Sequence, residues 1–322
     1  MFKKIISLVA AGMTIFSLTA CSNTKETSSK DNSSNGKEIT IGISLPAADH
    51  GWLGAVIADA EKEAKAQGVK YIITTADNPN KQTSDIEDLI TKNVSAIVMQ
   101  PIESDPMTPV AEKIKAAHIP LVVFDREIKS DNYDVLVKGD NKQIGTNAAK
   151  YISKSLGGKG KIVEITGNPS TVTELRTKGF HDELANNKDM EIITTQAADF
   201  QKEKALNVMQ NILQSQKQID AVYTQDDEMA LGVLQAIQEA GRKDIKIVTG
   251  AGGAKDVFKL IKDDNNVMKA TFLYSPTMIQ DAVKTAVELA NGKSAETKDK
   301  VIPADEVNKD NVSKYYDENS KY

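Results

Sequence analysis

The chain has 322 residues, of which 40% are hydrophobic and 26% charged, values that are ordinary for a soluble globular protein. Its net charge is −5 and its lysines are spread without a basic block, so its charge argues against a nucleic-acid partner. The length is sufficient for one large or two medium domains.

The first residues predict a signal peptide. A basic MFKK precedes an apolar stretch, residues 5–20, which is too short and too poorly flanked for a stable membrane span. The stretch ends in SLTAC, and Cys21 is the only cysteine of the chain. SLTAC resembles the lipobox of bacterial lipoproteins, whose cysteine is lipidated, with palmitate among its acyl chains. We therefore expect a lipoprotein signal peptide over 1–20; a plain signal peptide with an incidental cysteine is the alternative.

The next segment, residues 22–38, is rich in Ser, Asn and Lys and has almost no apolar side chain. Such a segment cannot bury enough surface to fold. We interpret residues 21–38 as a lipidated cysteine followed by a flexible tether. The expected location is the cell membrane, with the body anchored by lipid on its extracytoplasmic face.

From residue 39 onward, short apolar runs alternate with segments of helical periodicity. Strands are predicted over 39–45, 71–76, 96–101 and 120–125, and helices over 51–67, around 86–90 and over 109–117. In the helix over 51–67, Trp52, Val56, Ala60 and Ala64 share one face, and Gly68 follows as a stop.

The alternation then restarts. Strands are predicted over 135–140, 161–167, 191–198, 221–227, 245–253 and 269–274, and helices over 141–156, 171–185, 202–214, 228–240, 256–262 and 278–291. Continuous apolar strands between amphipathic helices predict parallel sheets covered on both faces. Because one core rarely grows beyond about 250–300 residues, ten strands predict two α/β lobes of about five strands each.

In open parallel sheets, ligands bind beyond the carboxyl ends of the strands. The polar and aromatic residues that follow the predicted strands are therefore candidates for a site. They are His50, Trp52, Gln100, Asp125 and Arg126 in the first half, and Arg176, Phe200, Asp226, Ala251 and Tyr274 in the second.

Five segments together resemble the ribose-type (type I) periplasmic sugar-binding proteins of ABC importers: TADNPNKQTSDIEDLI, PLVVFDRE, KGFHDEL, QAADFQKEKALNVMQNIL and TQDDEMALGVLQAIQEAG. The resemblance extends from residue 39 to about residue 303. It implies two Rossmann-like lobes joined by a three-strand hinge, with crossings near 138–142, 272–276 and 301–305. The N-terminal lobe would comprise 39–139 plus 275–303, and the C-terminal lobe 140–274 plus 304–322.

The resemblance also implies the ligand contacts. They are His50, Trp52, Leu53, Gln100, Asp125, Arg126, Arg176, Phe200, Asp226, Ala251 and Tyr274. Several of them depart from the ribose binders: His50, Gln100 and Asp226 stand where those proteins carry Asn, Ala251 where they carry Asp, and Tyr274 where they carry Gln. A ligand other than D-ribose is therefore expected.

These residue types suit a sugar. A carboxylate accepts from two neighbouring hydroxyls and a guanidinium donates to two, so Asp125 beside Arg126 offers both kinds of partner at one point. Two acidic and two basic side chains in the set favour a neutral ligand. Trp52 and Phe200 would lie against the C–H faces of the ring.

Each of these residues also has a structural interpretation. The pair of Asp125 and Arg126 is, by pattern alone, an ion pair at a strand end. Trp52 suits a helix core, Asp226 suits a helix N-cap that Asp227 could fill instead, and His50 suits an exposed turn.

Other classes of protein fit less well. With three histidines and no metal spacing, nucleophile elbow or P-loop, we expect no enzyme, no metal and no cofactor. A sugar-responsive repressor would carry a DNA-binding segment where this chain has its lipobox. The expected partners of this monomer are a small neutral sugar or polyol and ABC permease subunits with a cytoplasmic ATPase, and a chemoreceptor is a further candidate. A receptor for a furanosyl signalling molecule or a chemotaxis ligand is the alternative.

Overall fold

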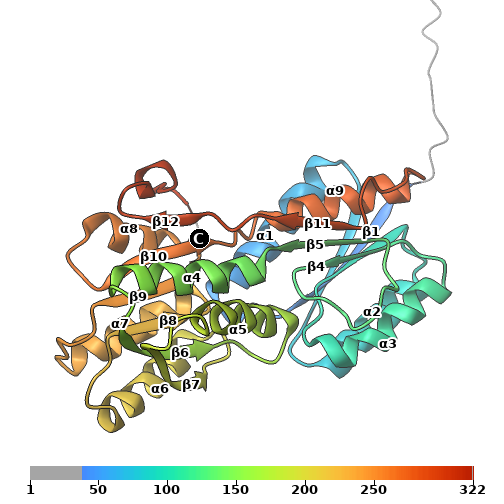
Figure 1. Ribbon diagram of the computed structural model, residues 1–322. Helices are drawn as coiled ribbons and strands as arrows, with labels where there is room; N and C mark the ends of the chain where they lie inside the picture. Colours follow the sequence, from blue (N-terminus) through green and yellow to red (C-terminus); the bar gives the residue numbers. More distant parts are fainter. Residues whose placement is uncertain (1–37, 321) are drawn as a thin grey trace, which may run out of the picture. The chain divides into compact units, whose positions relative to one another are not determined.

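The computed structural model describes residues 38–320 and 322, so the expected signal peptide, Cys21 and tether lie outside the described residues. The described part contains two six-stranded sheets with helices on their faces (Figure 1), which confirms the predicted α/β class. Within it, no helix has the length and apolar character that crossing a membrane requires.

The first sheet belongs to the N-terminal lobe, and its strand order is β11-β5-β4-β3-β1-β2. Its strands are β1 (Thr40–Pro46), β2 (Lys70–Ala76), β3 (Ala96–Met99), β4 (Leu121–Phe124), β5 (Val135–Gly139) and β11 (Asp299–Ile302). The helices of this lobe are α1 (Gly51–Ala66), α2 (Pro79–Thr91), α3 (Ser104–Ala116) and α9 (Met278–Ala290). Every residue of β3 and β4 is buried, as expected for central strands covered on both faces.

The second sheet belongs to the C-terminal lobe, and its strand order is β12-β10-β9-β8-β6-β7. Its strands are β6 (Gly160–Thr166), β7 (Met190–Ala197), β8 (Ala221–Thr224), β9 (Ile247–Gly252), β10 (Met268–Leu273) and β12 (Glu306–Asn308). Its helices are α4 (Asn141–Ser155), α5 (Thr171–Leu184), α6 (Lys202–Ser215), α7 (Asp227–Glu239) and α8 (Lys255–Asp263), followed by a 3₁₀ turn over Val312–Lys314.

Three segments connect the two lobes, between β5 and α4, between β10 and α9, and between β11 and β12 (Figure 1). The sheets hold six strands each instead of the five expected, because β11 and β12, which flank the third connection, each add an edge strand. β12 pairs antiparallel with β10, which departs from the all-parallel expectation. Helix α3 begins at Ser104, earlier than the predicted start at Pro109, and tolerates that proline in its interior.

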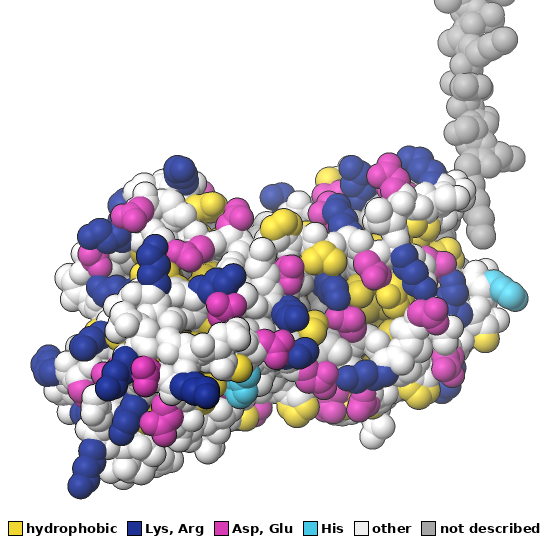
Figure 2. Space-filling model, in the orientation of Figure 1, with side chains coloured by type: hydrophobic (Ala, Val, Ile, Leu, Met, Phe, Trp, Pro, Cys, Tyr) yellow, Lys and Arg dark blue, Asp and Glu magenta, His cyan; other side chains and the backbone are white. Residues whose placement is uncertain are grey.

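On the face drawn in Figure 2, basic and acidic side chains are interspersed over both lobes. They form no basic stripe on this face. This distribution agrees with the absence of a basic block in the sequence.

Candidate binding site between the lobes

A cavity of about 40 Å³ lies between the lobes, where strands of both sheets end. Its lining comprises His50, Trp52, Asp125, Arg126, Val172, Arg176, Phe200, Asp226, Ala251, Gly252, Tyr274 and Tyr322. Nine of the eleven residues expected from the sequence are in this set. Leu53 and Gln100 are not in the lining: Leu53 is buried in the core, and Gln100 lies behind Asp125 and donates to it.

Asp125 receives hydrogen bonds from two side chains. Its Oδ2 accepts from Gln100 Nε2 at 2.7 Å and its Oδ1 accepts from the Tyr274 hydroxyl. The residue adopts φ = 65°, a left-handed conformation that turns the chain sharply after β4 ends at Phe124. The chain therefore adopts an uncommon backbone conformation just after the strand, where the Asp125 carboxylate lines the cavity.

Arg126 is held by the backbone, and not by a hydrogen bond to its neighbour. Its Nη1 donates to the Ile102 carbonyl at 2.7 Å, and its Nε lies 3.7 Å from Asp125 Oδ2, an ion-pair distance that is too long for a hydrogen bond. Among the described residues, Arg126 Nε has no hydrogen-bond partner, and neither have Gln100 Oε1 and His50 Nδ1. Because buried polar atoms are nearly always paired, the two such atoms on lining residues, Arg126 Nε and His50 Nδ1, suggest groups available to a polar ligand.

Arg176 connects to Asp125 through two other side chains. Its Nε donates to Asn141 Oδ1 at 2.9 Å, Asn141 Nδ2 donates to the Tyr274 hydroxyl at 3.3 Å, and that hydroxyl donates to Asp125. The Arg176 guanidinium also lies 4.5 Å from the centre of the Tyr274 ring, and it donates to the Gln225 carbonyl. A continuous polar network thus runs from one lobe to the other across the cavity.

Tyr274 is buried at the cavity between the lobes. Burial, followed by the charge of Asp125, raises the pKa of its phenol, so the hydroxyl stays protonated and available as a donor. Its ring lies so close to Gly139 that any β-carbon at that position would overlap it. A glycine at the end of β5 is therefore required for this tyrosine to occupy the cleft.

Asp226 caps a helix and also lines the cavity. Its Oδ1 accepts from the backbone N–H of Met229 at 2.8 Å, so the suggestion that Asp227 could serve as the N-cap of α7 is wrong. Asp227 instead accepts from the backbone N–H groups of Gly253 and Ala254 and from the Thr271 hydroxyl, and it fixes the turn after β9.

The carboxyl groups of Asp226 and Asp227 both have raised pKa values. Burial raises the pKa of Asp226 well above its usual range and that of Asp227 to about 6. In both groups burial opposes the charged form, and the hydrogen bonds that each carboxyl group accepts oppose this effect in part.

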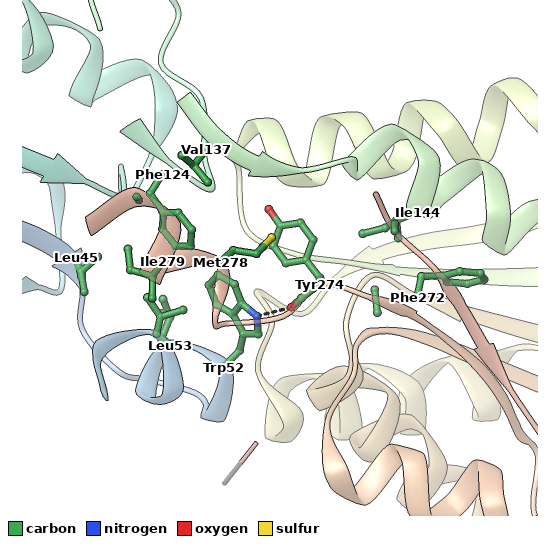
Figure 3. Packing of buried hydrophobic residues seen from close by; sticks show 14 of the residues in the cluster. Leu45, Trp52, Leu53, Phe124, Val137, Ile144, Phe272, Tyr274, Met278 and Ile279 are labelled. Carbon is green, nitrogen blue, oxygen red and sulfur yellow. Dashed lines mark hydrogen bonds between the residues drawn. The ribbon is translucent and has the colours of Figure 1, made fainter. Parts of the chain in front are cut away.

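Two aromatic residues flank the cavity. Trp52 donates from Nε1 to the Tyr274 carbonyl at 2.7 Å and stacks on Phe124, so it belongs to the core and to the cavity wall at once (Figure 3). Phe200 adopts φ = 62° and lies directly over Gly167, where a β-carbon would overlap its ring. A bulky residue in this conformation is strained, and such strain is concentrated at functional sites.

His50 is not the exposed turn residue that its pattern also allowed. It precedes α1, and only 8% of its side chain is exposed. Burial lowers its pKa to about 4, against the opposing effect of Asp49, so the imidazole is neutral at physiological pH.

Sequence reasoning missed several residues of the site. Val172, Gly252 and Tyr322 line the cavity, and Asn141 and Gln225 fix Arg176. Gly252 and Gln225 lie in the predicted strands over 245–253 and 221–227, and Asn141 begins the predicted helix over 141–156, but Val172 and Tyr322 carry no local signal. Among residues 38–320 and 322, no group of three or more His, Cys, Asp or Glu side chains could hold a metal ion.

Two α/β lobes, joined by three segments, flank a small cavity lined by charged and aromatic side chains, an arrangement that suits a solute-binding protein. Comparison with known proteins gives the same class: residues 41–294 match the family model described as a periplasmic binding protein domain. The chain belongs to the ribose-type (type I) periplasmic sugar-binding family, which confirms the resemblance seen in its motifs. Members of this family are binding components of transport systems, so the chain is not an enzyme.

Similar proteins carry different ligands in their names. The ribose import binding protein RbsB of Bacillus subtilis is 38% identical over 298 residues, covering 91% of this chain and 95% of the relative. The xylitol-binding protein of Mycolicibacterium smegmatis is 29% identical over 317 residues, covering 96% and 86%. A solved ABC transporter solute-binding protein from Bacillus halodurans with bound myo-inositol has a TM-score of 0.83 at 25% identity, covering 90% of this chain and 100% of that one.

Proposed function

We propose that this protein captures a neutral monosaccharide or sugar alcohol in the cavity between its lobes and delivers it to an ABC permease driven by a cytoplasmic ATPase. The observation that carries the proposal is the pair of buried polar atoms without partners on residues that line the cavity, Arg126 Nε and His50 Nδ1. Hydroxyls of a sugar would satisfy donors and acceptors of this kind, and Trp52 and Phe200 supply apolar faces for its ring. The relatives named for ribose, xylitol and myo-inositol support this ligand class.

We further propose that D-ribose is not the best ligand. Ala251 offers no polar side-chain atom where the ribose binders carry a carboxylate, and Tyr274 fills space where they carry Gln. An unmatched buried hydroxyl costs about 1–3 kcal/mol, so a pentose shaped for the other set of partners would bind less tightly here.

Titration calorimetry on residues 22–322 tests both statements. The panel contains D-ribose, D-xylose, D-glucose, xylitol, D-sorbitol, myo-inositol and the anionic D-gluconate. We expect a neutral compound other than ribose to have the lowest Kd. Ribose as the tightest ligand would reject the second statement alone, gluconate as the tightest would reject a neutral ligand, and binding of none of the panel would reject the proposed function.

We also propose that the protein is a lipoprotein anchored through Cys21 on the extracytoplasmic face of the cell membrane. The support is the SLTAC motif after an apolar segment, in a chain with one cysteine. Several acyl chains hold a protein firmly, whereas one gives only marginal attachment. We expect Cys21→Ala to move the protein from the membrane fraction to the medium; a variant that stays with the membrane would contradict the anchor.

A further inference from the structure

Tyr322 separates two spaces on the described surface. Together with Gly252 it lines both the cavity of about 40 Å³ and a larger outer groove of about 850 Å³. The groove runs between α1, which contributes Asp59 and Lys62, and the segment that follows β10, which contributes Ser275. The phenol ring thus forms part of the wall of both the cavity and the groove, and we call it the partition between them.

The ring is placed between the two lobes. An ideal β-carbon on Gly51, at the start of α1, would lie 3.9 Å from Cδ2 of the ring, and one on Gly252, in the other lobe, would lie 2.5 Å from the phenol oxygen. Gly252 has φ = 145°, so a side chain there would be strained and would also collide with the phenol. Glycine at this position leaves room for Tyr322.

The segment that carries Tyr322 is tied to the C-terminal lobe. Lys255 Nζ donates to the Ser320 carbonyl at 2.7 Å, and Ser320 Oγ donates to the Tyr322 carbonyl at 2.5 Å. The tyrosine packs against the buried apolar clusters of the molecule from both sides of the cleft. Burial, followed by the nearby Asp227 and Asp226, raises the pKa of the phenol, so the partition is an uncharged ring.

The small volume of the cavity gives this partition its importance. A space of about 40 Å³ holds a few water molecules at most, whereas small-molecule sites in proteins measure roughly 300–1,000 Å³. A sugar therefore requires displacement of the lining. Tyr274 is fixed by the Trp52, Asp125 and Asn141 hydrogen bonds, whereas among the described residues the Tyr322 hydroxyl has no hydrogen bond that would fix it.

We infer that Tyr322 is a specificity-determining residue: its ring closes the end of the cavity at Gly252 and limits the length of the ligand. The inference rests on the proposed function, because it assigns a role at the same cavity. Removal of the ring would join the cavity to the outer groove, so a longer ligand would gain room and a short one would lose its end wall.

The test measures Kd by calorimetry for ligands of increasing length: erythritol, xylitol and D-sorbitol, then D-xylose and D-glucose, and finally sucrose. The variants are Tyr322→Ala, Tyr322→Phe and the control Tyr316→Ala. Tyr316 belongs to the same segment and is half-buried beside Lys262, but it lines neither space. Thermal unfolding of each variant verifies that it is folded.

For Tyr322→Ala we expect the Kd of a longer ligand divided by the Kd of a shorter one to fall at least tenfold relative to wild type. Tyr322→Phe keeps the ring and should change the ratio less than threefold, and Tyr316→Ala less than twofold. If wild type binds members of the panel but Tyr322→Ala keeps the same ratio, or Tyr316→Ala shifts it equally, the inference is wrong and the proposed function stands. If wild type binds none of the panel, the inference and the proposed function are both wrong.

Discussion

At the scale of single residues, Asp125 is the point on which the polar contacts of the cleft converge. Gln100 and Tyr274 donate to it, Arg126 lies beside it, and its backbone is in the left-handed region. The contact of this pair with a ligand stays a prediction, because a buried carboxylate accepts hydrogen bonds in a structural ion pair as well as in a binding site.

Replacement of Asp125 by Asn should weaken ligand binding by at least ~2 kcal/mol, about thirtyfold in Kd, because the charge opposite Arg126 is lost inside the cleft. Asn tolerates a positive φ, so the backbone turn is kept and the effect can be assigned to the carboxylate. Calorimetry with the best ligand measures the loss. Asp182→Asn, which breaks an exposed pair with Lys178, is the control and should leave Kd within twofold. Equal affinity of Asp125→Asn and wild type would return the pair to a purely structural role.

His50 should make the protein sensitive to acid. Its pKa falls from 6.5 to about 4 on folding, chiefly through burial, with Asp49 opposing and Arg126 adding. Between these values the unfolded chain binds a proton that the folded chain does not, so the free energy of unfolding decreases as pH falls from 6.5 to about 4. Replacement of His50 by Asn should therefore reduce the decrease in the free energy of unfolding between pH 6.5 and about 4.

Urea unfolding at pH 7, 5.5 and 4 measures the effect as the difference between variant and wild type, since the raised pKa values of Asp226 and Asp227 act in the opposite sense in both proteins. His118→Asn is the matched control, because His118 is exposed and has φ = 57°, which Asn accepts. A parallel pH dependence in His50→Asn and wild type would contradict the role assigned to burial.

At the scale of elements, helices α4 and α5 approach each other at backbone contact. A β-carbon on Gly179 would overlap the Lys142 carbonyl, and one on Gly145 would overlap the Arg176 carbonyl. This approach places Arg176 on α5 within reach of Asn141 at the start of α4. The geometry of the cleft thus depends on two glycines that do not touch it.

Gly179→Ala should destabilise the protein by about 1–3 kcal/mol, because the added methyl group has no space and forces the helices apart. For a protein of this size we expect Tm to fall by at least about 2 °C. Ligand affinity should fall too, since α5 carries Arg176. Gly54→Ala on α1 is the control: a β-carbon there meets nothing within 4 Å, so Tm should stay the same or rise. A similar Tm for both variants would mean that the helices can separate without cost.

The helices and the ten main strands were predictable because their apolar periodicity is strong. Strand β11 was not, since three of its four residues are exposed and give no apolar run, and β12 is only three residues long. The predicted start of helix α3 at Pro109 is too late, because the helix accommodates this proline in its interior.

Part of the site was predictable because topology fixes residues at the ends of strands, and the motif resemblance added others, such as Arg176 on α5. Asp125, Arg126 and Asp226 follow strands directly, so their location at the cavity follows from a parallel sheet. The contributions of Asn141 and Tyr322 depend on how distant segments pack, and no local pattern reports that packing.

At the scale of the whole binding unit, residues 38–322, hydrogen bonds and ion pairs connect the lobes along the cleft. Glu127 N donates to Thr171 Oγ1 at 2.8 Å, Gln201 Nε2 donates to Asp49 Oδ2 at 3.1 Å, and Lys129 Nζ lies 3.1 Å from Glu174 Oε2. These contacts describe a closed arrangement, and a sugar can be admitted only if they open.

A saturating ligand should shift the protein from an open to a closed arrangement, because contacts from both lobes are made only when the lobes are together. Small-angle scattering should show a smaller radius of gyration with ligand than without it. At 100 times its Kd the same ligand should add about 2.7 kcal/mol to the free energy of unfolding. A ligand that stabilises the protein while the radius stays constant would contradict closure.

The third connection has a consequence for biosynthesis. The N-terminal lobe is begun first, but its edge strand β11 pairs with β5 only after about 160 further residues have been made. Helix α9, which packs on α1, β3, β4 and β5, also belongs to this late segment. At roughly 5–20 residues per second, the sheet waits about 8–30 s with one edge unpaired and one face uncovered. The lobe that is begun first is therefore completed only after most of the C-terminal lobe has been made, shortly before β12 completes the second sheet.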